Sequence, residues 1–238
     1  MTRNIRVLGI IPARGGSKRV PRKNLALLAG KPLLSYAIHA AQESRMLDAC
    51  IVSTDDPEIA AVAKSLGADV PFLRPRKYAQ DSSRDIAYVR HALEWLRRHR
   101  TWQPEIIVLL PPDTPLRTGR DIDNVVRFLI KEKLDSVRTL AGPIRHPSCK
   151  AMWTMKDAHG KSVTPLFPDF VGKPAQEVPP YYLSVGLVYA TRARFIKRGN
   201  LWGKRIGGYV MNAEKCIEID EQEQLSQAEA LLHKRKSP

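Results

Sequence analysis

Cysteines and long apolar runs are scarce in this chain, and each scarcity narrows the class of protein. Its 238 residues include three cysteines, Cys50, Cys149 and Cys216, which are far apart and lack metal-ligand spacing, so a disulfide scaffold or a zinc module is not expected. No apolar run approaches the roughly 20 residues that a membrane-spanning helix needs. The first apolar run is cut by Pro12 and Arg14, which argues against a signal peptide. We therefore expect a cytoplasmic protein without membrane insertion.

Acidic residues are also scarce, above all near the start of the chain. The sequence has 39 Lys and Arg against 24 Asp and Glu, a net charge of +15, and its first acid is Glu43. Such an excess favours an anionic partner, which can be a nucleotide, an acidic sugar, a nucleic acid or a membrane surface. Aromatic residues make up 7% of the chain and no nucleic-acid-binding motif is present, so nucleic-acid binding is the weaker alternative.

The first 140 residues alternate between strand and helix patterns. Apolar runs predict strands over 7–11, 50–54, 70–73, 106–110 and 136–140. Helical spacing predicts helices over 33–47, 57–67 and 86–96, and one that opens at Thr118 and runs through Ile130. This alternation indicates an α/β fold with a mostly parallel central sheet covered on both faces. Ligands on such sheets bind beyond the carboxyl ends of the strands.

The alternation breaks after about residue 142. Six prolines lie between His146 and Tyr182, where 149–155 leads into a turn at 157–161 and so predicts a hairpin. Beyond this segment the patterns predict strands over 185–190, 209–212 and 216–219, a short helix over 192–198 and a final amphipathic helix. We expect a single domain over 1–238, with residues 143–182 as an arm inserted within it.

Residues 10–24 are the most informative stretch of the chain. They follow the first predicted strand and contain Gly15-Gly16, Ser17 and five cationic side chains, without an acid. Glycine lets the backbone approach an anion closely, backbone N–H groups can point inward, and cations neutralise phosphate charge. The spacing fits neither the common phosphate loop nor the dinucleotide loop, so a basic, solvated turn is the alternative interpretation.

This stretch closely resembles the N-terminal signature of the acylneuraminate cytidylyltransferases (CMP-sialic acid synthetases), including those that activate pseudaminic and legionaminic acid. Further segments match that family in the same order, at 51–60, 70–75, 109–118 and 217–220, followed by Ala228-Glu229. The resemblance implies a Rossmann-like nucleotidyltransferase fold and a homodimer, in which the inserted arm serves dimerisation and borders the partner's active site. It also implies Mg²⁺-dependent transfer of CMP from CTP to the anomeric hydroxyl of a nonulosonic (sialic-acid-like) sugar acid. This reaction releases pyrophosphate and belongs to cell-surface polysaccharide biosynthesis.

The resemblance also assigns the nucleotide site. The family's phosphate and ribose contacts match Ala13, Arg14, Gly15, Gly16, Ser17, Lys18, Lys23 and Asn24, and its base contacts correspond to Arg74, Ser83 and Asp85. Among these, Arg14 and Lys23 are expected to act in catalysis together with Asp220. An ion pair with Asp81 or Asp85 is the alternative for Arg74. A carboxylate at Asp85 can accept from cytosine or from guanine, so GTP remains the alternative nucleotide.

The metal and the sugar acid need further residues. A triphosphate needs Mg²⁺ or Mn²⁺, and the family match gives Asp220 and Glu218 as ligands, which alternation puts on one side of a strand. The alternative is an acidic strand edge that leads into a helix. For the sugar, this chain has Pro111, Ala175 and Val185 where the family has polar residues, and the remaining expected contacts are Lys150, Gln176, Tyr181 and Tyr182. An altered sugar pocket beside an intact nucleotide loop predicts the same chemistry on a different acceptor, and another 3-deoxy-2-keto sugar acid is the alternative to a nonulosonic acid.

Overall fold

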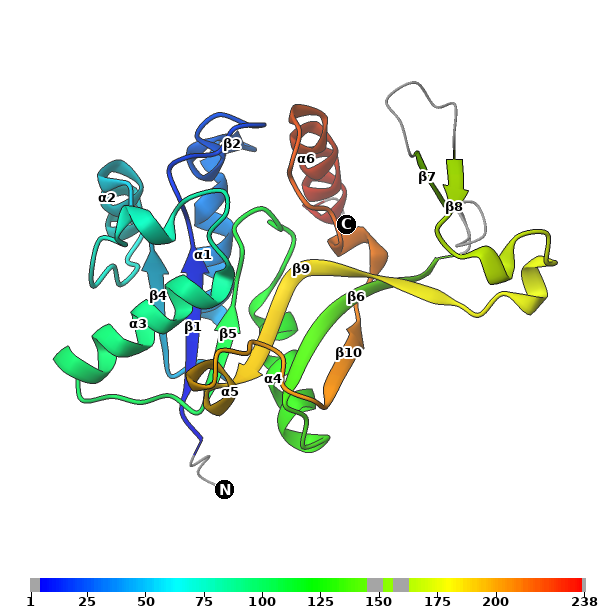
Figure 1. Cartoon of the computed structure of the whole chain (residues 1–238). Coiled ribbons are helices and arrows are strands. Elements are labelled where there is room, and N and C mark those ends of the chain that lie inside the picture. Colours follow the sequence, from blue (N-terminus) through cyan, green and yellow to red (C-terminus); the bar gives the residue numbers. More distant parts are fainter. Residues whose placement is uncertain (1–4, 145–151, 156–162, 237–238) are drawn as a thin grey trace.

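A six-stranded sheet lies between two layers of helices, and an arm projects from one side of this body (Figure 1). The computed structural model describes residues 5–144, 152–155 and 163–236. The strand order is β10 (Ile206–Val210), β6 (Ser136–Ile144), β9 (Tyr181–Arg192), β5 (Ile106–Leu109), β1 (Val7–Pro12) and β4 (Ala49–Ser53). β1 pairs in parallel with β4 and β5, and β10 with β6, whereas β9 is antiparallel to both of its neighbours. The predicted α/β fold with a mostly parallel sheet is therefore confirmed.

Each face of the sheet carries its own apolar core. Buried side chains of α1 (Leu33–Glu43), α2 (Pro57–Ser65) and α4 (Gly119–Lys131) pack on one face, and those of α3 (Asp85–His99) and α5 (Ala193–Lys197) pack on the other. In a third cluster, Leu225 and Ala228 of α6 (Gln222–Lys236) pack with Val20 and Leu28 of the segment after β1. α6 therefore holds the basic segment against the body. No described helix has the length and the apolar character needed to cross a bilayer.

Local sequence signals set the starts of two helices as predicted. The Asp56 carboxylate accepts from the backbone N–H groups of Glu58 at 2.8 Å and Ile59 at 3.1 Å, and Pro57 is the first helical residue of α2. A reciprocal capping box between Thr118 and Asp121 opens α4. α2 begins shortly after β4 ends, and α4 follows β5 after the loop 110–118, so both starts lie beyond the carboxyl ends of parallel strands, where such sheets bind ligands.

Three element predictions are wrong, each for a tertiary reason. α1 ends at Glu43 because Asp123 of α4 accepts hydrogen bonds from the Ser44 hydroxyl and from the backbone of the next two residues, which fixes a turn there. The segment 70–73 makes an isolated bridge and no strand, since Pro71 lacks an N–H for a ladder. The segment 216–219 crosses the strand ends, where Ile219 N donates to Asp113 O at 2.8 Å, and it forms no strand.

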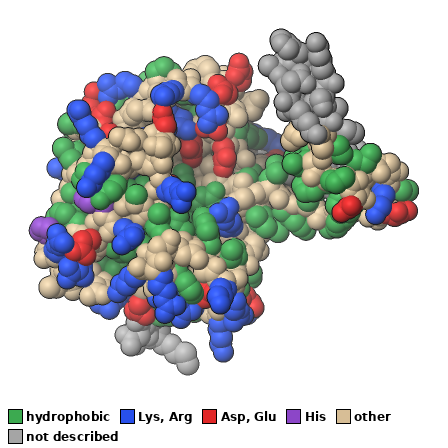
Figure 2. Space-filling view, in the orientation of Figure 1, with side chains coloured by type: hydrophobic (Ala, Val, Ile, Leu, Met, Phe, Trp, Pro, Cys, Tyr) green, Lys and Arg blue, Asp and Glu red, His purple; other side chains and the backbone are tan. Residues whose placement is uncertain are grey.

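The arm leaves the body through two paired strands. β6 and β9 stay paired as far as Ile144 and Tyr181, and beyond them β7 (Trp153–Met155) pairs with β8 (Val163–Pro165) as an antiparallel hairpin. The turn predicted at 157–161 lies outside the described residues. Hydrophobic side chains gather along the arm in Figure 2, and several are 40–51% exposed: Leu166, Phe167, Val171, Tyr182 and Leu183.

Candidate active site

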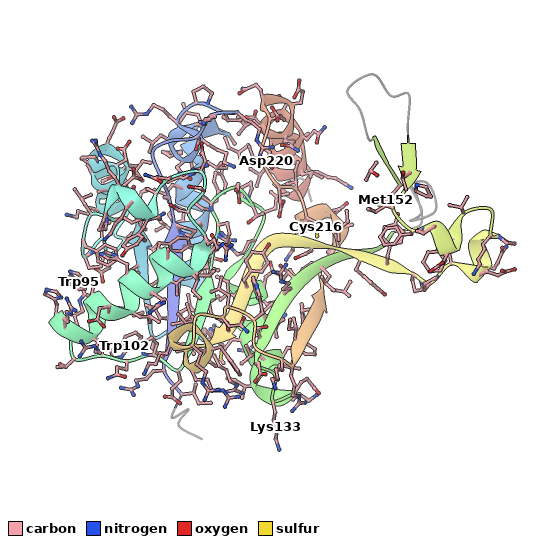
Figure 3. All side chains as sticks on the ribbon, viewed as in Figure 1. Trp95, Trp102, Lys133, Met152, Cys216 and Asp220 are labelled. Atoms are coloured by element: carbon pink, nitrogen blue, oxygen red, sulfur yellow. The ribbon has the colours of Figure 1, made fainter. Side chains whose placement is uncertain are left out.

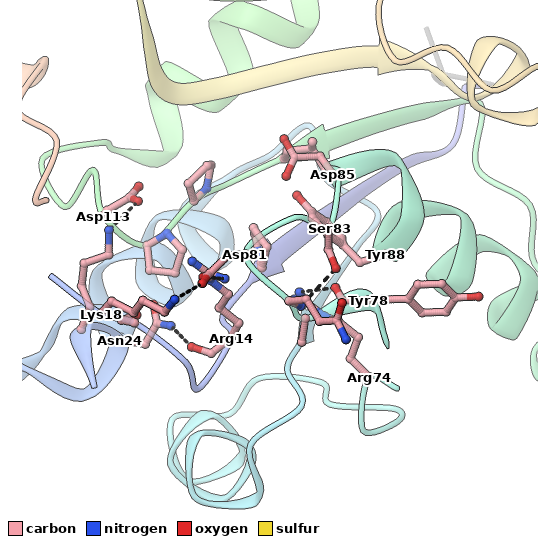
Figure 4. Close-up of a pocket in the computed structure, with 18 of the residues that line it drawn as sticks. Arg14, Lys18, Asn24, Arg74, Tyr78, Asp81, Ser83, Asp85, Tyr88 and Asp113 are labelled. Carbon is pink, nitrogen blue, oxygen red and sulfur yellow. Dashed lines mark hydrogen bonds and ion pairs between the residues drawn. The ribbon is translucent and has the colours of Figure 1, made fainter. Parts of the chain in front are cut away.

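A pocket of about 410 Å³ opens at the carboxyl ends of β1 and β5, beside β9 (Figure 4). Its lining includes most of the predicted nucleotide contacts and one predicted metal ligand, namely Arg14, Ser17, Lys18, Lys23, Asn24, Arg74, Ser83, Asp85 and Asp220. These residues come from four separate segments of the chain. The charged side chains therefore lie together at the carboxyl ends of the strands, which is the edge of the sheet predicted to bind a ligand.

Hydrogen bonds to neighbouring segments hold the loop after β1 in place. Asn24 is buried, and its side-chain amide donates to Arg14 O at 2.8 Å, while Ala13 N donates to Ser53 O at 3.0 Å. Gly15 N donates to the Asp55 carboxylate at 3.1 Å, so this amide does not point into the pocket as expected. A Cβ at Gly15 would lie 2.7 Å from a carboxylate oxygen of Asp56, which explains the need for glycine there. Gly16, in contrast, has open space around its Cα.

Asp81 occupies the cationic part of the loop. Its carboxylate lies 2.6 Å from Arg14 Nη1 and 2.6 Å from Lys18 Nζ, as the dashed lines in Figure 4 indicate. The hydrogen bonds from Lys18 and Arg14 hold the pKa of Asp81 below its ordinary value. The two cations therefore already bind an anionic group, and Asp81 takes the place that a phosphate would need.

Arg74 forms the buried wall of the pocket. It is 4% exposed, its guanidinium donates to Ser53 Oγ at 3.1 Å and to Ser53 O, and it stacks 4.6 Å from the centre of the Tyr88 ring. Burial lowers the pKa of Arg74. The alternative ion pairs with Asp81 or Asp85 are absent within the described parts of the chain.

Asp85 and Ser83 lie at the start of α3, at the side of the pocket away from the loop. Burial raises the pKa of Asp85, an effect that a hydrogen bond from the Tyr88 hydroxyl opposes. Ser83 Oγ accepts from Gln80 N at 3.0 Å and donates to Lys77 O at 3.2 Å, so this hydroxyl shapes the turn before α3. Asp85 thus presents a carboxylate that water still reaches, at the start of α3 and beside the buried Tyr88.

Lys23 joins two carboxylates at the other end of the pocket. Lys23 Nζ lies 3.0 Å from Asp113 Oδ2, 3.2 Å from Asp220 Oδ1 and 2.9 Å from Ile219 O. Arg19 reaches the same Asp220 carboxylate at 2.9 Å, which makes it part of the site. Asp220, labelled in Figure 3, lies just before α6. Arg22, by contrast, pairs with Glu58 at 2.7 Å, outside the pocket lining.

Glu218 does not share a strand face with Asp220 as predicted. One of its carboxylate oxygens accepts from Gly186 N in β9, while Asp220 turns to Lys23. Burial raises the pKa of Glu218, and the nearby carboxylates of Asp113 and Asp220 raise it further. No group of three possible ligand side chains that could hold a metal occurs within the residues described. Asp113 and Asp220 nevertheless suit Mg²⁺, which proteins hold with one or two carboxylates while phosphates and water complete its shell.

Asp113 and Tyr189 are pocket residues that sequence reasoning missed. Asp113 follows the apolar run of β5 and the pair Pro111-Pro112, and an acid placed directly after a buried strand is a signal of a ligand-facing position. Arg117 holds this loop. It is 4% exposed and donates to Thr114 Oγ1 at 3.0 Å, to Pro111 O at 2.9 Å and to the backbone of β9, and burial lowers its pKa to about 10.

The predicted sugar contacts lie elsewhere in this chain. Gln176, Tyr181 and Tyr182 belong to the arm and its junction with β9, and none of them lines the pocket. Lys150 lies outside the described residues. Within its described residues, a single chain therefore brings most of the predicted nucleotide residues into the pocket, but not Gln176, Tyr181 or Tyr182.

The open α/β sheet thus gathers cations and two carboxylates beyond its strand ends, where folds of this kind bind ligands. A family profile described as Cytidylyltransferase matches residues 8–236. The chain belongs to the cytidylyltransferase family, and it is an enzyme of the nucleotidyltransferase class.

Relatives with assigned names support this placement. The chain is 35% identical to a CMP-N,N'-diacetyllegionaminic acid synthase of Legionella pneumophila, over 91% of both chains. It is 48% identical to a pseudaminic acid cytidylyltransferase of Campylobacter jejuni, over 38% of this chain and 39% of the relative. Its fold is similar to that of a CMP:2-keto-3-deoxy-manno-octonic acid synthetase complexed with CTP, with a TM-score of 0.70 and 17% identity, over 97% of this chain and 99% of that one.

Proposed function

We propose that this enzyme transfers CMP from CTP to the anomeric hydroxyl of a nonulosonic acid and releases pyrophosphate. The observation that carries the proposal is the convergence of Arg14, Lys18 and Lys23 with Asp113 and Asp220 in one pocket. Family membership supports the cytidylyl donor, and relatives named for legionaminic and pseudaminic acid support the acceptor class.

The loop cations bind the triphosphate in this proposal. The phosphates displace Asp81 from Arg14 and Lys18, and both cations then face the charge that grows on the leaving pyrophosphate. Asn24 keeps the loop in position through its bond to Arg14 O. The enzyme acts mainly by positioning the hydroxyl in line with the α-phosphorus and by stabilising charge, without a covalent intermediate.

Mg²⁺ (or Mn²⁺) is the proposed cofactor, and Asp113 and Asp220 are the residues that would hold it. When bound, a divalent cation neutralises phosphate charge and lowers the pKa of a bound hydroxyl. Lys23 now lies between these two carboxylates, so it must turn towards the phosphates when they bind. Glu218 becomes available as a further ligand when its hydrogen bond from Gly186 N is released.

Asp85 supports base recognition in the proposed complex. A carboxylate there accepts from the N4 amino group of cytosine, and Arg74 and Tyr88 form the wall behind it. A carboxylate also accepts from guanine, which keeps GTP as the second candidate nucleotide. The pKa of Asp85 is raised above its ordinary value by burial, and a base that donates a hydrogen bond to its carboxylate favours the charged form.

We also propose a single domain with an inserted arm at 143–182 that forms a homodimer in the cytoplasm, where CTP is available. The exposed apolar side chains of the arm support a second copy as their partner, because exposed apolar surface of this kind marks interfaces. In such a dimer Gln176, Tyr181, Tyr182 and Lys150 of one copy would reach the pocket of the other.

The test is a substrate matrix. The protein is incubated with Mg²⁺, each of the four NTPs and N,N'-diacetyllegionaminic, pseudaminic or N-acetylneuraminic acid, and released pyrophosphate is measured. We expect release with CTP and at least one of these acids. Release with GTP but not CTP would overturn the assignment of the base, and no release with any pair would overturn the proposed function. Wild-type protein without sugar acid serves as the control for hydrolysis.

A further inference from the structure

Arg138 on β6 is a charged side chain that the nucleotide half of the site leaves without a role. It lies directly opposite Tyr189 in the β6–β9 pairing, and Tyr189 lies opposite Leu109 of β5, so the three residues form one row across the sheet. Tyr189 and Leu109 both line the pocket. Since neighbouring strands are about 4.8 Å apart, Arg138 stands one strand beyond the pocket wall, within the reach of an arginine side chain.

Among the described residues, the guanidinium of Arg138 lies over an aromatic ring and makes one hydrogen bond, which leaves its other donors available. It stacks on the Trp202 ring, 3.7 Å from its centre, and lies 5.7 Å from the centre of the Tyr189 ring. Its Nη1 donates to Ser184 Oγ at 3.3 Å, and Ser184 is exposed on β9. An arginine stacked on an aromatic ring presents its remaining N–H groups edgewise, in the geometry that binds a carboxylate with two hydrogen bonds.

Arg138 has no acidic partner within the parts of the chain that the structure describes, since its interactions there are with Ser184, Tyr189 and Trp202, apart from weaker charge effects. Its charge nevertheless reaches the pocket, because it lowers the pKa values of Asp85 and Tyr189 against the larger effect of burial. Val137, the preceding residue, is fully buried on the opposite face, so Arg138 faces the side of the sheet that carries α3.

The cations that line the pocket in the described part of the chain all have other partners. Within the described residues, the pocket cations Arg14, Lys18, Arg19 and Lys23 already pair with Asp81, Asp113 or Asp220, and Arg74 is committed to Ser53 and Tyr88. The acceptor in the proposed reaction carries a carboxylate next to the hydroxyl that attacks. A carboxylate that leaves water needs a charged donor, and a bidentate arginine suits it best.

We propose that Arg138 binds the carboxylate of the sugar acid, beside Ser184 and Tyr189, and thereby selects acidic acceptors. This inference rests on the proposed function and specifies its acceptor subsite. The Trp202 stack keeps the guanidinium in place before the sugar arrives, so little side-chain freedom is lost on binding. Pro111, Ala175 and Val185 stand where the family has polar residues. Their loss fits this arrangement, because Arg138 of β6 supplies the charged contact to the sugar instead.

The test compares the wild type with Arg138→Met and Arg138→Lys on whichever sugar acid the wild type uses. Hydrogen bonds to a charged group are strong enough that Arg138→Met should raise the KM for the sugar acid about 10- to 100-fold while the KM for CTP stays unchanged. Arg138→Lys keeps the charge but cannot donate the two parallel hydrogen bonds, so its KM for the sugar acid should lie between those of the wild type and Arg138→Met. Arg127→Met on α4 is the matched control, because Arg127 is exposed and pairs with Asp123 outside the pocket.

A chemical change in the sugar separates binding from a structural role. The carboxamide of the same sugar should be a poorer acceptor than the acid for the wild type, and this preference should disappear in Arg138→Met. If Arg138 only supports Trp202 and Tyr189, the preference for the acid persists in the variant, which overturns the inference. A wild type inactive with every sugar acid and CTP refutes the proposed function itself and, with it, the inference. An active wild type with unchanged variant kinetics refutes only the role of Arg138.

Discussion

Lys23 is the residue whose loss should affect stability and catalysis together. Its ammonium group is 3.0 Å from one carboxylate, Asp113, and 3.2 Å from another, Asp220, and the side chain is 17% exposed. At an effective dielectric constant of about 20, each contact corresponds to about 5 kcal/mol of Coulomb attraction before desolvation. Asp113 and Asp220 keep roughly a third of their side-chain surface, 31% and 36%, so water screens both pairs and much of this attraction is offset.

Lys23→Met should therefore lower the free energy of unfolding by about 2 to 3 kcal/mol, between the values typical of surface and buried pairs. For a chain of this size this corresponds to a fall in Tm of roughly 5 to 10 °C, measured by scanning calorimetry. Turnover of CTP with the sugar acid should fall by at least about 100-fold, as when one preorganised donor to a developing charge is removed. Lys31→Met, an exposed lysine of the short strand β3 (Lys31–Pro32), is the control.

A double-mutant cycle with Asp113→Asn decides whether the contact itself carries the effect. Once Asp113 is neutral, the loss of Lys23 leaves less uncompensated charge, so the double variant should be more stable than the sum of the single losses predicts, by about 1 kcal/mol. Strict additivity would mean that the two residues do not interact in solution. Wild-type turnover in Lys23→Met would refute the assignment of the phosphate site.

Three further substitutions test other contacts. Asp81→Asn should tighten CTP binding a few-fold in titration calorimetry, since it frees Arg14 and Lys18; weaker binding would show that Asp81 helps to hold the nucleotide. Gly119→Ala should lower the free energy of unfolding by about 1 to 3 kcal/mol in urea, because its Cβ would lie 2.6 Å from Glu43 Cβ; unchanged stability would mean that α1 and α4 shift freely. The folded-state pKa of Glu218 is raised, so its ionisation costs stability as the pH rises. Glu218→Gln should thus gain Tm over the wild type as the pH rises above the ordinary pKa of glutamate, about 4.3, and a difference that stays constant with pH would contradict this.

Elements with local signals were predictable from the sequence. β1 and β5 are short apolar runs, and the starts of α2 and α4 carry capping residues, so neither kind of element needs knowledge of the rest of the fold. The end of α1 was not predictable, because its turn is fixed by a residue 79 positions away from Ser44 in sequence. Long-range contacts of this kind leave no periodic pattern in the chain.

The site was predictable in its cations and less so in its acids. A basic, glycine-containing stretch after a strand favours an anion site, the family resemblance picks out its residues, and Arg14, Lys18 and Lys23 all line the pocket. Asp81 and Asp113 gain their roles from being folded against those cations, and their local sequence does not reveal which cation each one meets. The local sequence also fails to place Glu218, which was expected on the same side of a strand as Asp220 and instead accepts a hydrogen bond from Gly186 of β9.

The arm joins the body through two neighbouring strands, which makes it a segment that related enzymes could exchange. Its two ends enter and leave as adjacent, paired strands, with Ile144 opposite Tyr181, and β6 and β9 pair again, through two register shifts, down to Ser136 and Thr191. A segment anchored like this is modular: its length and content can change while the two anchoring strands stay the same. Grafting the arm of a related synthetase onto β6 and β9 would then recombine acceptor preference with an untouched nucleotide pocket.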